Sequence, residues 1–320
     1  MRHRLTEYLA DVTRSVLLAR PVGRAVTVFS DDTFLVSYPR VGSNWARFLI
    51  CNLLRPEPGL SLLEAEARIP GVYINSDRAL QRLPRPRILK SHEPFDARYP
   101  RVIYVVRDPR DVAVSRYYFT LKWRGFSDGY PFEDFVKQRF LVAGNAVLNT
   151  GPWGDHVLGW LAARAATDHF MLVRYEDLKR DTAQELGRIS ALLGVDADAA
   201  RIVRAIELSS FDRMRALDEK EPLKWLKRGR SDVPFIREGR SGGWRNVLPA
   251  EAVAAIESAW WPVMRLLGYE LATPFPDGMP EPHVNAQVCE ALATSVHRDH
   301  QGAAWRVPEE ACTASGLEKA

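Results

Sequence analysis

The sequence predicts an α/β fold in which helices flank a mainly parallel central sheet. Short apolar runs alternate along the chain with segments of helical periodicity, a pattern typical of parallel strands joined by right-handed crossovers. The run Val102–Val106 contains no polar residue, which indicates a strand that is buried on both faces. With 320 residues the chain is long enough to bury the core of one large domain of this kind.

Four segments are predicted strands, and two later segments are predicted helices with clear start and stop signals. The strands are expected at residues 34–38, 87–90, 102–106 and 169–174. One helix is expected over Thr182–Leu193, with a capping box formed by Thr182 and Glu185 and with Gly194 past its end. The other is expected from Pro249 to about residue 267, because proline favours the first turn and a glycine follows.

The two ends of the chain are predicted to be peripheral to a domain that spans residues 1–271. Apolar residues recur on one face of a helix over residues 3–19, and we expect that helix to pack on the domain. Residues 272–320 hold several prolines and no sustained periodicity, so they are expected to form an extension that is partly disordered. The charged stretch 216–234 is either a loop over the site or a solvated connection.

Bulk composition narrows the class of protein. A net charge of +4 and a pI near 9.0 suit an anionic ligand, although a mildly basic surface gives the same values. Three cysteines form no disulfide framework, and the N-terminus does not resemble a signal peptide, so a cytoplasmic location is expected. We also expect no membrane insertion, no nucleic-acid partner and no bound metal, since the corresponding patterns are missing from the sequence.

The segment Ser37–Trp45 predicts a phosphate-binding turn between a strand and a helix. Gly42 lies at the expected turn, and Ser43 or Asn44 is placed to cap the helix. The N–H groups at a helix N-terminus bind phosphate, and Arg40 adds a full positive charge. The Gly-Lys-Ser/Thr pattern of nucleotide triphosphatases is missing from this turn.

Two further basic motifs are expected at the same edge of the sheet. Lys90 and His92 follow one predicted strand, and Arg107 follows the next. Ligands of parallel sheets bind outside the carboxyl ends of the strands, so these side chains are predicted to converge on one site.

The ordered set of motifs resembles the sulfotransferases that use 3′-phosphoadenosine 5′-phosphosulfate (PAPS). Besides the segment Ser37–Trp45, the motifs are Arg87–His92, Val102–Ser115, Val173–Leu178, Ser209–Phe211 and Phe235–Trp244. The resemblance extends from about Thr33 to Tyr269. It implies a P-loop-like, three-layer fold and transfer of a sulfuryl group to an acceptor hydroxyl, with release of 3′-phosphoadenosine 5′-phosphate (PAP).

The resemblance implies catalytic roles for three residues. His92 stands where the family has its catalytic base, in the Lys90-Ser91-His92 segment, and Glu93 is the competing candidate. Arg40 and Lys90 would stabilise charge on the transferring and leaving groups. Cytosolic members usually have a lysine in place of Arg40, and an arginine keeps the charge but does not release a proton.

The resemblance also implies a set of residues that bind the PAPS co-substrate. They are Arg40, Gly42, Ser43, Asn44, Trp45, Arg107, Ser115, Tyr175, Ser209, Phe211, Arg237 and Gly239. The turn residues would hold the 5′-phosphate, and Trp45 would stack on adenine. The 3′-phosphate would lie on Arg107, Ser115 and Arg237. Glu238 stands where cytosolic members often have a lysine, so its carboxylate is expected to turn away from that phosphate.

The acceptor is predicted only as a small-molecule, lipid or carbohydrate hydroxyl, and the oligomeric state is left open. Candidate lining residues, which could equally be core, are Tyr117, Tyr118, Phe119, Trp123, Phe126 and Tyr130. His156, in a further motif that resembles the family, is interpreted as structural. The alternatives are a nucleotide-dependent kinase, which lacks its Gly-Lys-Ser/Thr here, and a non-catalytic nucleotide-binding protein, which would not need His92.

Overall fold

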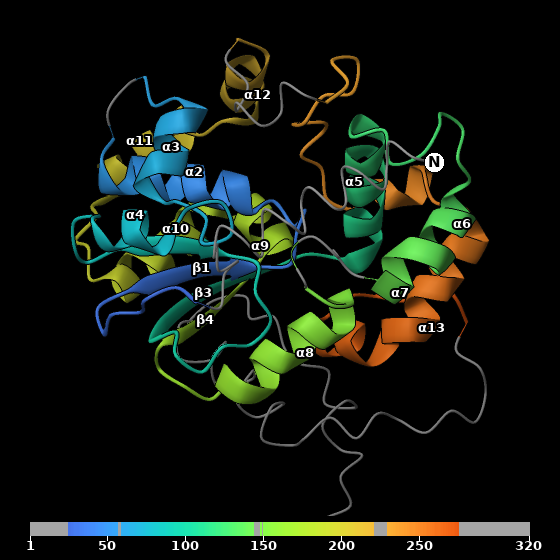
Figure 1. Ribbon diagram of the computed structural model, residues 1–320, viewed down its shortest axis with the longest axis horizontal. Helices are drawn as coiled ribbons and strands as arrows, with labels where there is room; N and C mark the ends of the chain where they lie inside the picture. Colours follow the sequence, from blue (N-terminus) through green and yellow to red (C-terminus); the bar gives the residue numbers. More distant parts are fainter. Residues whose placement is uncertain (1–24, 57–58, 144–147, 149, 221–228, 275–320) are drawn as a thin grey trace, which may run out of the picture.

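A computed structural model of the protein describes residues 25–274, except residues 57–58, 144–147, 149 and 221–228 (Figure 1). The predicted helix over residues 3–19 lies outside the described residues, as do residues 221–228 of the stretch 216–234 and nearly all of the extension 272–320. The first residues of the stretch 216–234 are the end of a helix that reaches Lys220, so the expected loop or connection is wrong for that part. The start of that extension is held in place, because the backbone N–H groups of Ala272 and Thr273 donate to the Glu257 carboxylate.

The centre of the described molecule is a four-stranded parallel sheet with the strand order β2-β1-β3-β4. Its strands are β1 (Thr33–Ser37), β2 (Ile88–Ser91), β3 (Arg101–Val106) and β4 (Phe170–Arg174). All four predicted strands are confirmed, with ends that differ by no more than one residue. β1 and β3 are buried almost throughout, which explains their apolar sequences.

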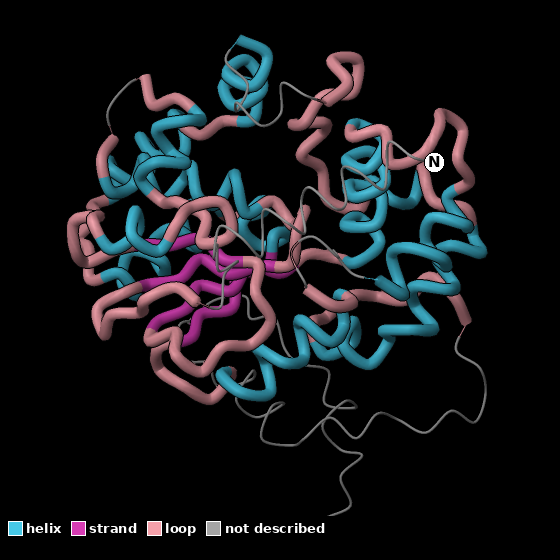
Figure 2. Tube along the Cα trace, viewed as in Figure 1, coloured by secondary structure: helices cyan, strands magenta, loops and turns pink. Residues whose placement is uncertain are grey.

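Two groups of helices pack around this sheet (Figures 1 and 2). The first group, beside β1 and β4, contains α2 (Ser43–Leu54), α3 (Leu62–Arg68), α4 (Asp77–Gln81), α9 (Tyr175–Arg180), α10 (Thr182–Leu193), α11 (Ala199–Leu208) and α12 (Phe211–Lys220). The second gathers around α13 (Ala250–Leu266) and contains α5 (Pro109–Lys122), α6 (Phe132–Phe135), the π-helical turn η1 (Val136–Phe140), α7 (Leu141–Ala143), α8 (Trp153–Arg164) and the 3₁₀ turn η3 (Gly243–Asn246). The predicted helical α/β architecture with a parallel sheet is therefore confirmed.

Two predicted helix caps are wrong in their details. α2 is capped by Gly42 in the left-handed conformation, so Ser43 and Asn44 are the first helical residues rather than caps. α10 spans the predicted residues, but its N-cap is Asp181, whose carboxylate accepts from the Gln184 N–H. The Thr182 hydroxyl instead donates to the Leu178 carbonyl in the preceding helix α9. An aspartate one position earlier thus replaces the expected capping box.

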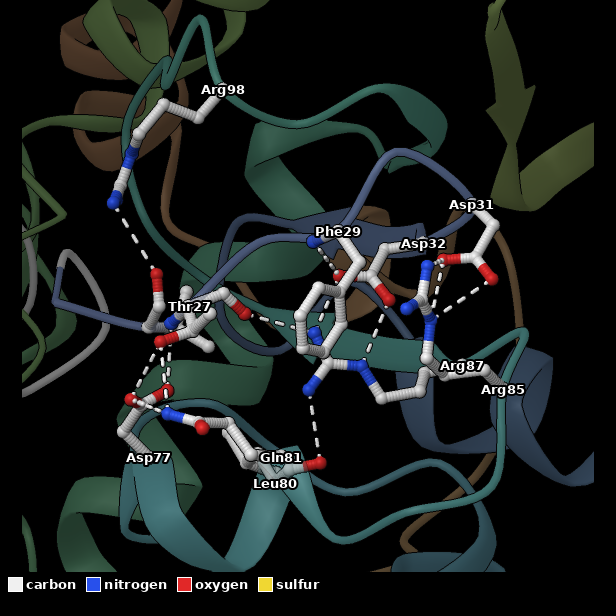
Figure 3. A network of polar contacts seen from close by, with 11 residues as sticks. Thr27, Phe29, Asp31, Asp32, Asp77, Leu80, Gln81, Arg85, Arg87 and Arg98 are labelled. Carbon is white, nitrogen blue, oxygen red and sulfur yellow. Dashed lines mark hydrogen bonds and ion pairs between the residues drawn. The ribbon is translucent and has the colours of Figure 1, made fainter.

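The amino-terminal ends of β1 and β2 are joined by a closed ionic network (Figure 3). The Arg87 guanidinium donates to both carboxylate oxygens of Asp32, at 2.8 and 2.5 Å, and both side chains are fully buried. Nη1 donates to the Leu80 carbonyl and Nη2 also donates to the Thr27 carbonyl, and the guanidinium plane stacks on Phe29. Each of the three guanidinium nitrogens of Arg87 therefore has an acceptor at this edge of the sheet.

Candidate active site

The turn from β1 into α2 is shaped by backbone conformation. Gly42 has φ = 97°, and a Cβ atom at this position would lie 2.6 Å from the Tyr175 ring. Arg40, two residues earlier, also has a positive φ, of 77°, which is uncommon for a residue with a side chain. The turn therefore presses its backbone against Tyr175 and directs the Arg40 side chain toward α5.

Arg40 lies in a cage of aromatic and neutral polar groups. Its guanidinium lies 4.7 Å from the ring centre of Phe119 and 4.6 Å from that of Phe235. Its Nε donates to Ser115 Oγ at 3.2 Å, and Nη2 donates to the Phe235 carbonyl at 3.3 Å. Burial, followed by the charges of Arg107 and Arg237, lowers the pKa of Arg40 to about 9. Arg116 adds a third positive charge near Arg40, and the Asp218 carboxylate partly opposes these charges.

Lys90, at the end of β2, is held by the first turn of α2. Its Nζ donates to Asn44 Oδ1 at 2.8 Å, and the same oxygen accepts from Arg47 Nη2 at 3.0 Å. Burial, followed by the charge of Arg47, lowers the pKa of Lys90 well below its ordinary value. Arg47 was missed in the sequence analysis, although it follows Asn44 by three residues and therefore lies on the same helix face.

His92 is fixed in one tautomer. Its Nδ1 lies 2.7 Å from the Ser37 carbonyl oxygen, which can only accept, so Nδ1 carries the hydrogen. In the neutral ring Nε2 is then an acceptor. Burial, followed by the charge of Lys90, holds the pKa of His92 well below its ordinary value, and the Tyr73 ring stacks on it at 4.9 Å. The arrangement presents an unprotonated nitrogen, which is what a general base requires.

Arg107, after β3, faces the loop that follows residue 235. Its Nη2 donates to the Arg240 carbonyl at 2.6 Å, its guanidinium stacks on Tyr175, and its Nε is buried without a partner. Asp111, one turn later in α5, was also missed in the sequence analysis. Its carboxylate accepts from the N–H groups of Gly242 and Trp244 at 2.7 and 3.0 Å, and so tethers this loop to α5.

A wall of aromatic residues lies beside the turn. Trp45 meets Tyr175 edge to face, and its Nε1 donates to the Ser209 carbonyl at 3.0 Å. Gly239 has φ = 60°, and a Cβ atom there would lie 2.6 Å from the Phe211 ring. Gly42 and Gly239 thus make the same kind of contact, with the backbone directly against a ring.

All of these side chains line one cavity of about 930 Å³. Every residue that the sequence predicts for catalysis or for PAPS binding is among its lining residues. His92 lines it and Glu93 does not, which favours His92 as the base. Lys90 lies near the carboxyl end of β2 and Arg107 follows the carboxyl end of β3, and these two strands flank β1. Both side chains therefore reach the same edge of the sheet, as the topology predicts.

Comparison with known proteins shows which family this chain belongs to. Residues 30–268 match the family model described as the sulfotransferase domain. The chain belongs to the sulfotransferase family. It is 30% identical over 249 residues to Sulfotransferase 2B1 of Mus musculus, covering 73% of this chain and 71% of that relative. It is also 30% identical to the 3-beta-hydroxysteroid sulfotransferase of Cavia porcellus over 241 residues, covering 72% and 82%.

The fold agrees with that assignment. The solved structure of retinol dehydratase in complex with androsterone and PAP superposes with a TM-score of 0.62 at 18% identity, covering 79% of this chain and 84% of that one. The sulfotransferase described here is therefore an enzyme of sulfuryl transfer with the P-loop-like fold that the sequence predicts.

The structure adds detail to two expectations about this sulfotransferase. Glu238 lines the cavity and accepts from Arg237 Nη2 at 3.0 Å, and its position relative to a bound 3′-phosphate stays a prediction. Of the six candidate acceptor aromatics, only Phe119 and Trp123 line the cavity. Tyr117, Phe126 and Tyr130 pack on one another and on neighbouring rings instead, and Tyr118 lies under the Arg237 guanidinium.

His156 lies behind the cavity wall. It is buried, it does not line the cavity, and both its ring nitrogens have hydrogen-bond partners. Within the described ranges no three His, Cys, Asp or Glu residues gather as a metal site, and no helix there is long and apolar enough to cross a membrane.

Proposed function

We propose that this sulfotransferase moves a sulfuryl group from PAPS to the hydroxyl of a small-molecule acceptor and releases PAP. The observation that carries the proposal is the neutral His92 ring, whose Nδ1 is committed to the Ser37 carbonyl and whose Nε2 is left to accept a proton within the cavity. In the reaction, the acceptor hydroxyl gives its proton to Nε2 while its oxygen bonds to sulfur. The bond between sulfur and the 5′-phosphate oxygen breaks, and its electron pair stays on PAP.

The cations of the cavity fit a donor that carries several negative charges. Among the residues that the structure describes, Lys90 donates to the neutral Asn44 oxygen, and Arg40 donates to the neutral oxygens of Ser115 and Phe235. The buried Arg107 Nε has no partner among the described residues. Phosphate and sulfate oxygens would supply these missing acceptors.

The contacts of Arg40 refine its predicted role. We assign it to the region between the two phosphate-binding groups, because its Nε donates to Ser115, the residue predicted for the 3′-phosphate. Lys90, near the base, is then the main cation for the transferring group. We assign the adenosine to the part of the cavity that Trp45 and Phe211 line.

Small apolar alcohols are the acceptor class that we propose to test first. Phe119, Trp123, Phe235 and Ile74 give the cavity an apolar wall. Two relatives of known name also point this way, since one is called a hydroxysteroid sulfotransferase and one neighbour binds androsterone.

The test has a binding step and a transfer step. Calorimetry should show tight PAP binding that does not need magnesium, and much weaker ATP binding. Incubation with ³⁵S-labelled PAPS and androsterone, retinol or glucose should then label an apolar alcohol. Magnesium-dependent ATP binding without preference for PAP would contradict the donor assignment, and labelling of glucose alone would contradict the acceptor class.

A further inference from the structure

The backbone immediately after β2 is held by two ring N–H donors from α8. β2 ends at Ser91, so the carbonyls of the next two residues have no partners within the sheet. The His92 carbonyl accepts from His156 Nε2 at 3.2 Å, and the Glu93 carbonyl accepts from Trp160 Nε1 at 3.1 Å. His156 and Trp160 are four residues apart and therefore lie on one face of α8.

The hydrogen positions on His156 follow from its partners. The His92 carbonyl can only accept, so His156 Nε2 carries the hydrogen. Its Nδ1 must then accept from the Tyr104 hydroxyl, which lies 2.8 Å away in the core of β3. Burial lowers the pKa of His156 to about 4, so the ring stays neutral near pH 7. The donor that faces His92 is consequently always present.

The chain of hydrogen bonds continues through His92. Its backbone carbonyl accepts from His156, and its own Nδ1–H donates to the Ser37 carbonyl on β1. The base is thus attached at both ends, through its backbone to α8 and through its ring to the sheet. His156 and Trp160 do not line the cavity, so they would affect transfer through the backbone of His92 and Glu93, to which they donate.

We propose that His156 and Trp160 are positioning residues that set the direction of the His92 Nε2 lone pair. The proposal rests on the proposed function, because it concerns the same base. Proton transfer requires the base within about 3 Å of the hydroxyl and correctly aligned, so a small rotation of the segment after β2 lowers the rate without weakening donor binding. A merely structural role would change stability and leave turnover per folded molecule unchanged.

The test compares three variants with the parent, using androsterone as the acceptor probe and ³⁵S-labelled PAPS. His156→Phe removes both hydrogen bonds, and we expect kcat to fall about 10- to 100-fold, with the Kd for PAP within twofold. His156→Gln offers an amide donor to His92 and an acceptor to Tyr104, and should retain kcat within about threefold. Trp160→Phe keeps an aromatic ring without the N–H donor and should lower kcat about three- to tenfold.

Nuclear magnetic resonance keeps the inference separate from the proposed function. ¹⁵N spectra of the parent should show His92 as the Nδ1–H tautomer, and His156→Phe should shift or broaden the Nε2 signal while His156→Gln preserves it. This holds even if PAPS is not the donor, whereas loss of all PAPS turnover in the parent contradicts only the proposed function. Unchanged kcat and ¹⁵N signals in Trp160→Phe and His156→Phe would overturn the inference, as would equal losses in His156→Gln and His156→Phe. If His156→Phe does not fold, Trp160→Phe and the parent spectrum still decide the matter.

Discussion

At the amino-terminal ends of β1 and β2, Arg87 lies against Asp32; at the carboxyl end of β2, Lys90 lies against the amide of Asn44. Both basic side chains are buried, and both belong to the same short stretch of chain. Arg87 has a carboxylate that matches its charge and carbonyls for its other donors. Lys90 has one hydrogen-bond acceptor among the described residues, and it is neutral. Nearby Arg47 adds a second positive charge, which the Glu66 carboxylate opposes only in part because it forms no ion pair with Lys90.

This difference distinguishes a charge that stabilises the fold, at Arg87, from a charge that is placed to bind an anionic ligand, at Lys90. A buried cation with a buried carboxylate is neutralised within the protein, and removing either partner leaves an unpaired charge. A buried cation with only neutral partners keeps its desolvation cost until an anion arrives. Substitutions at the first edge should therefore change stability, and substitutions at the second should change binding and catalysis.

The largest expected effect is on stability at the paired edge. Arg87→Met leaves Asp32 buried without its partner, and we expect the free energy of unfolding to fall by about 3–5 kcal/mol. Urea denaturation followed by circular dichroism measures this change. Arg85→Met is the matched control, because the Arg85–Asp31 pair is exposed and should contribute little. Equal losses of unfolding free energy in the two variants would contradict the distinction between the buried Arg87–Asp32 pair and the exposed Arg85–Asp31 pair.

Lys90→Met should give the opposite result. Turnover should fall about 10²- to 10³-fold because a cation at the transferring group is lost. The free energy of unfolding should stay the same or rise by about 1 kcal/mol, since a buried charge without a carboxylate partner is removed. Asn44 still accepts from Arg47, so no new unpaired group is created. A large loss of unfolding free energy would show that Lys90, like Arg87, stabilises the fold.

Arg107→Ala tests a second cation at the carboxyl ends of the strands, where the ligand is proposed to bind. We expect the affinity for PAP to fall about 10- to 100-fold, because hydrogen bonds to the 3′-phosphate are lost. Adenosine 5′-phosphosulfate lacks that phosphate and should bind within about threefold of the parent. Calorimetric titration with both ligands measures the ratio. Equal weakening of the two would remove Arg107 from the 3′-phosphate site.

An effect that is absent near neutral pH is a pH dependence of stability that comes from His156, behind His92. Its pKa of about 4 in the folded protein is lower than in the unfolded chain, so the unfolded state binds more protons between pH 6.5 and 4. Its contribution to stability is complete above pH 6.5 and is lost as the pH falls toward 4. Relative to His156→Gln, the parent should lose up to about 1.4 kcal/mol of unfolding free energy per pH unit in that window. Parallel stability curves for the two proteins would contradict this assignment.

The sequence predicts the sheet, and it predicts residues that line the cavity together, because both depend on local patterns. Uninterrupted apolar runs mark β1 and β3, and the motif residues follow strands whose carboxyl ends must share an edge. The sequence does not show which other residues contact the motif residues in the folded protein. Arg47 and Asp111 resemble ordinary helix residues until the fold brings Lys90 and the loop at Gly242 against them.

The aromatic residues show the same limit. Phe119 and Tyr117 are both aromatic and lie on the same helix, α5, yet Phe119 lines the cavity and Tyr117 packs against Phe132. Which face of α5 meets the core depends on the packing of α6 and α13, which no local pattern encodes. The cap of α10 was misplaced for a related reason, since Asp181 and Thr182 are both good caps and only the chain direction after α9 selects one.

The charge of Lys90 beside His92 makes the strength of the base depend on the co-substrate. Lys90 is the largest cause, after burial, of the lowered pKa of His92. An anion that binds Lys90 would cancel part of that field and raise the pKa of His92. Under the proposed function, donor binding would therefore make His92 a stronger base, and an acceptor that arrives first would meet a histidine with less tendency to take its proton.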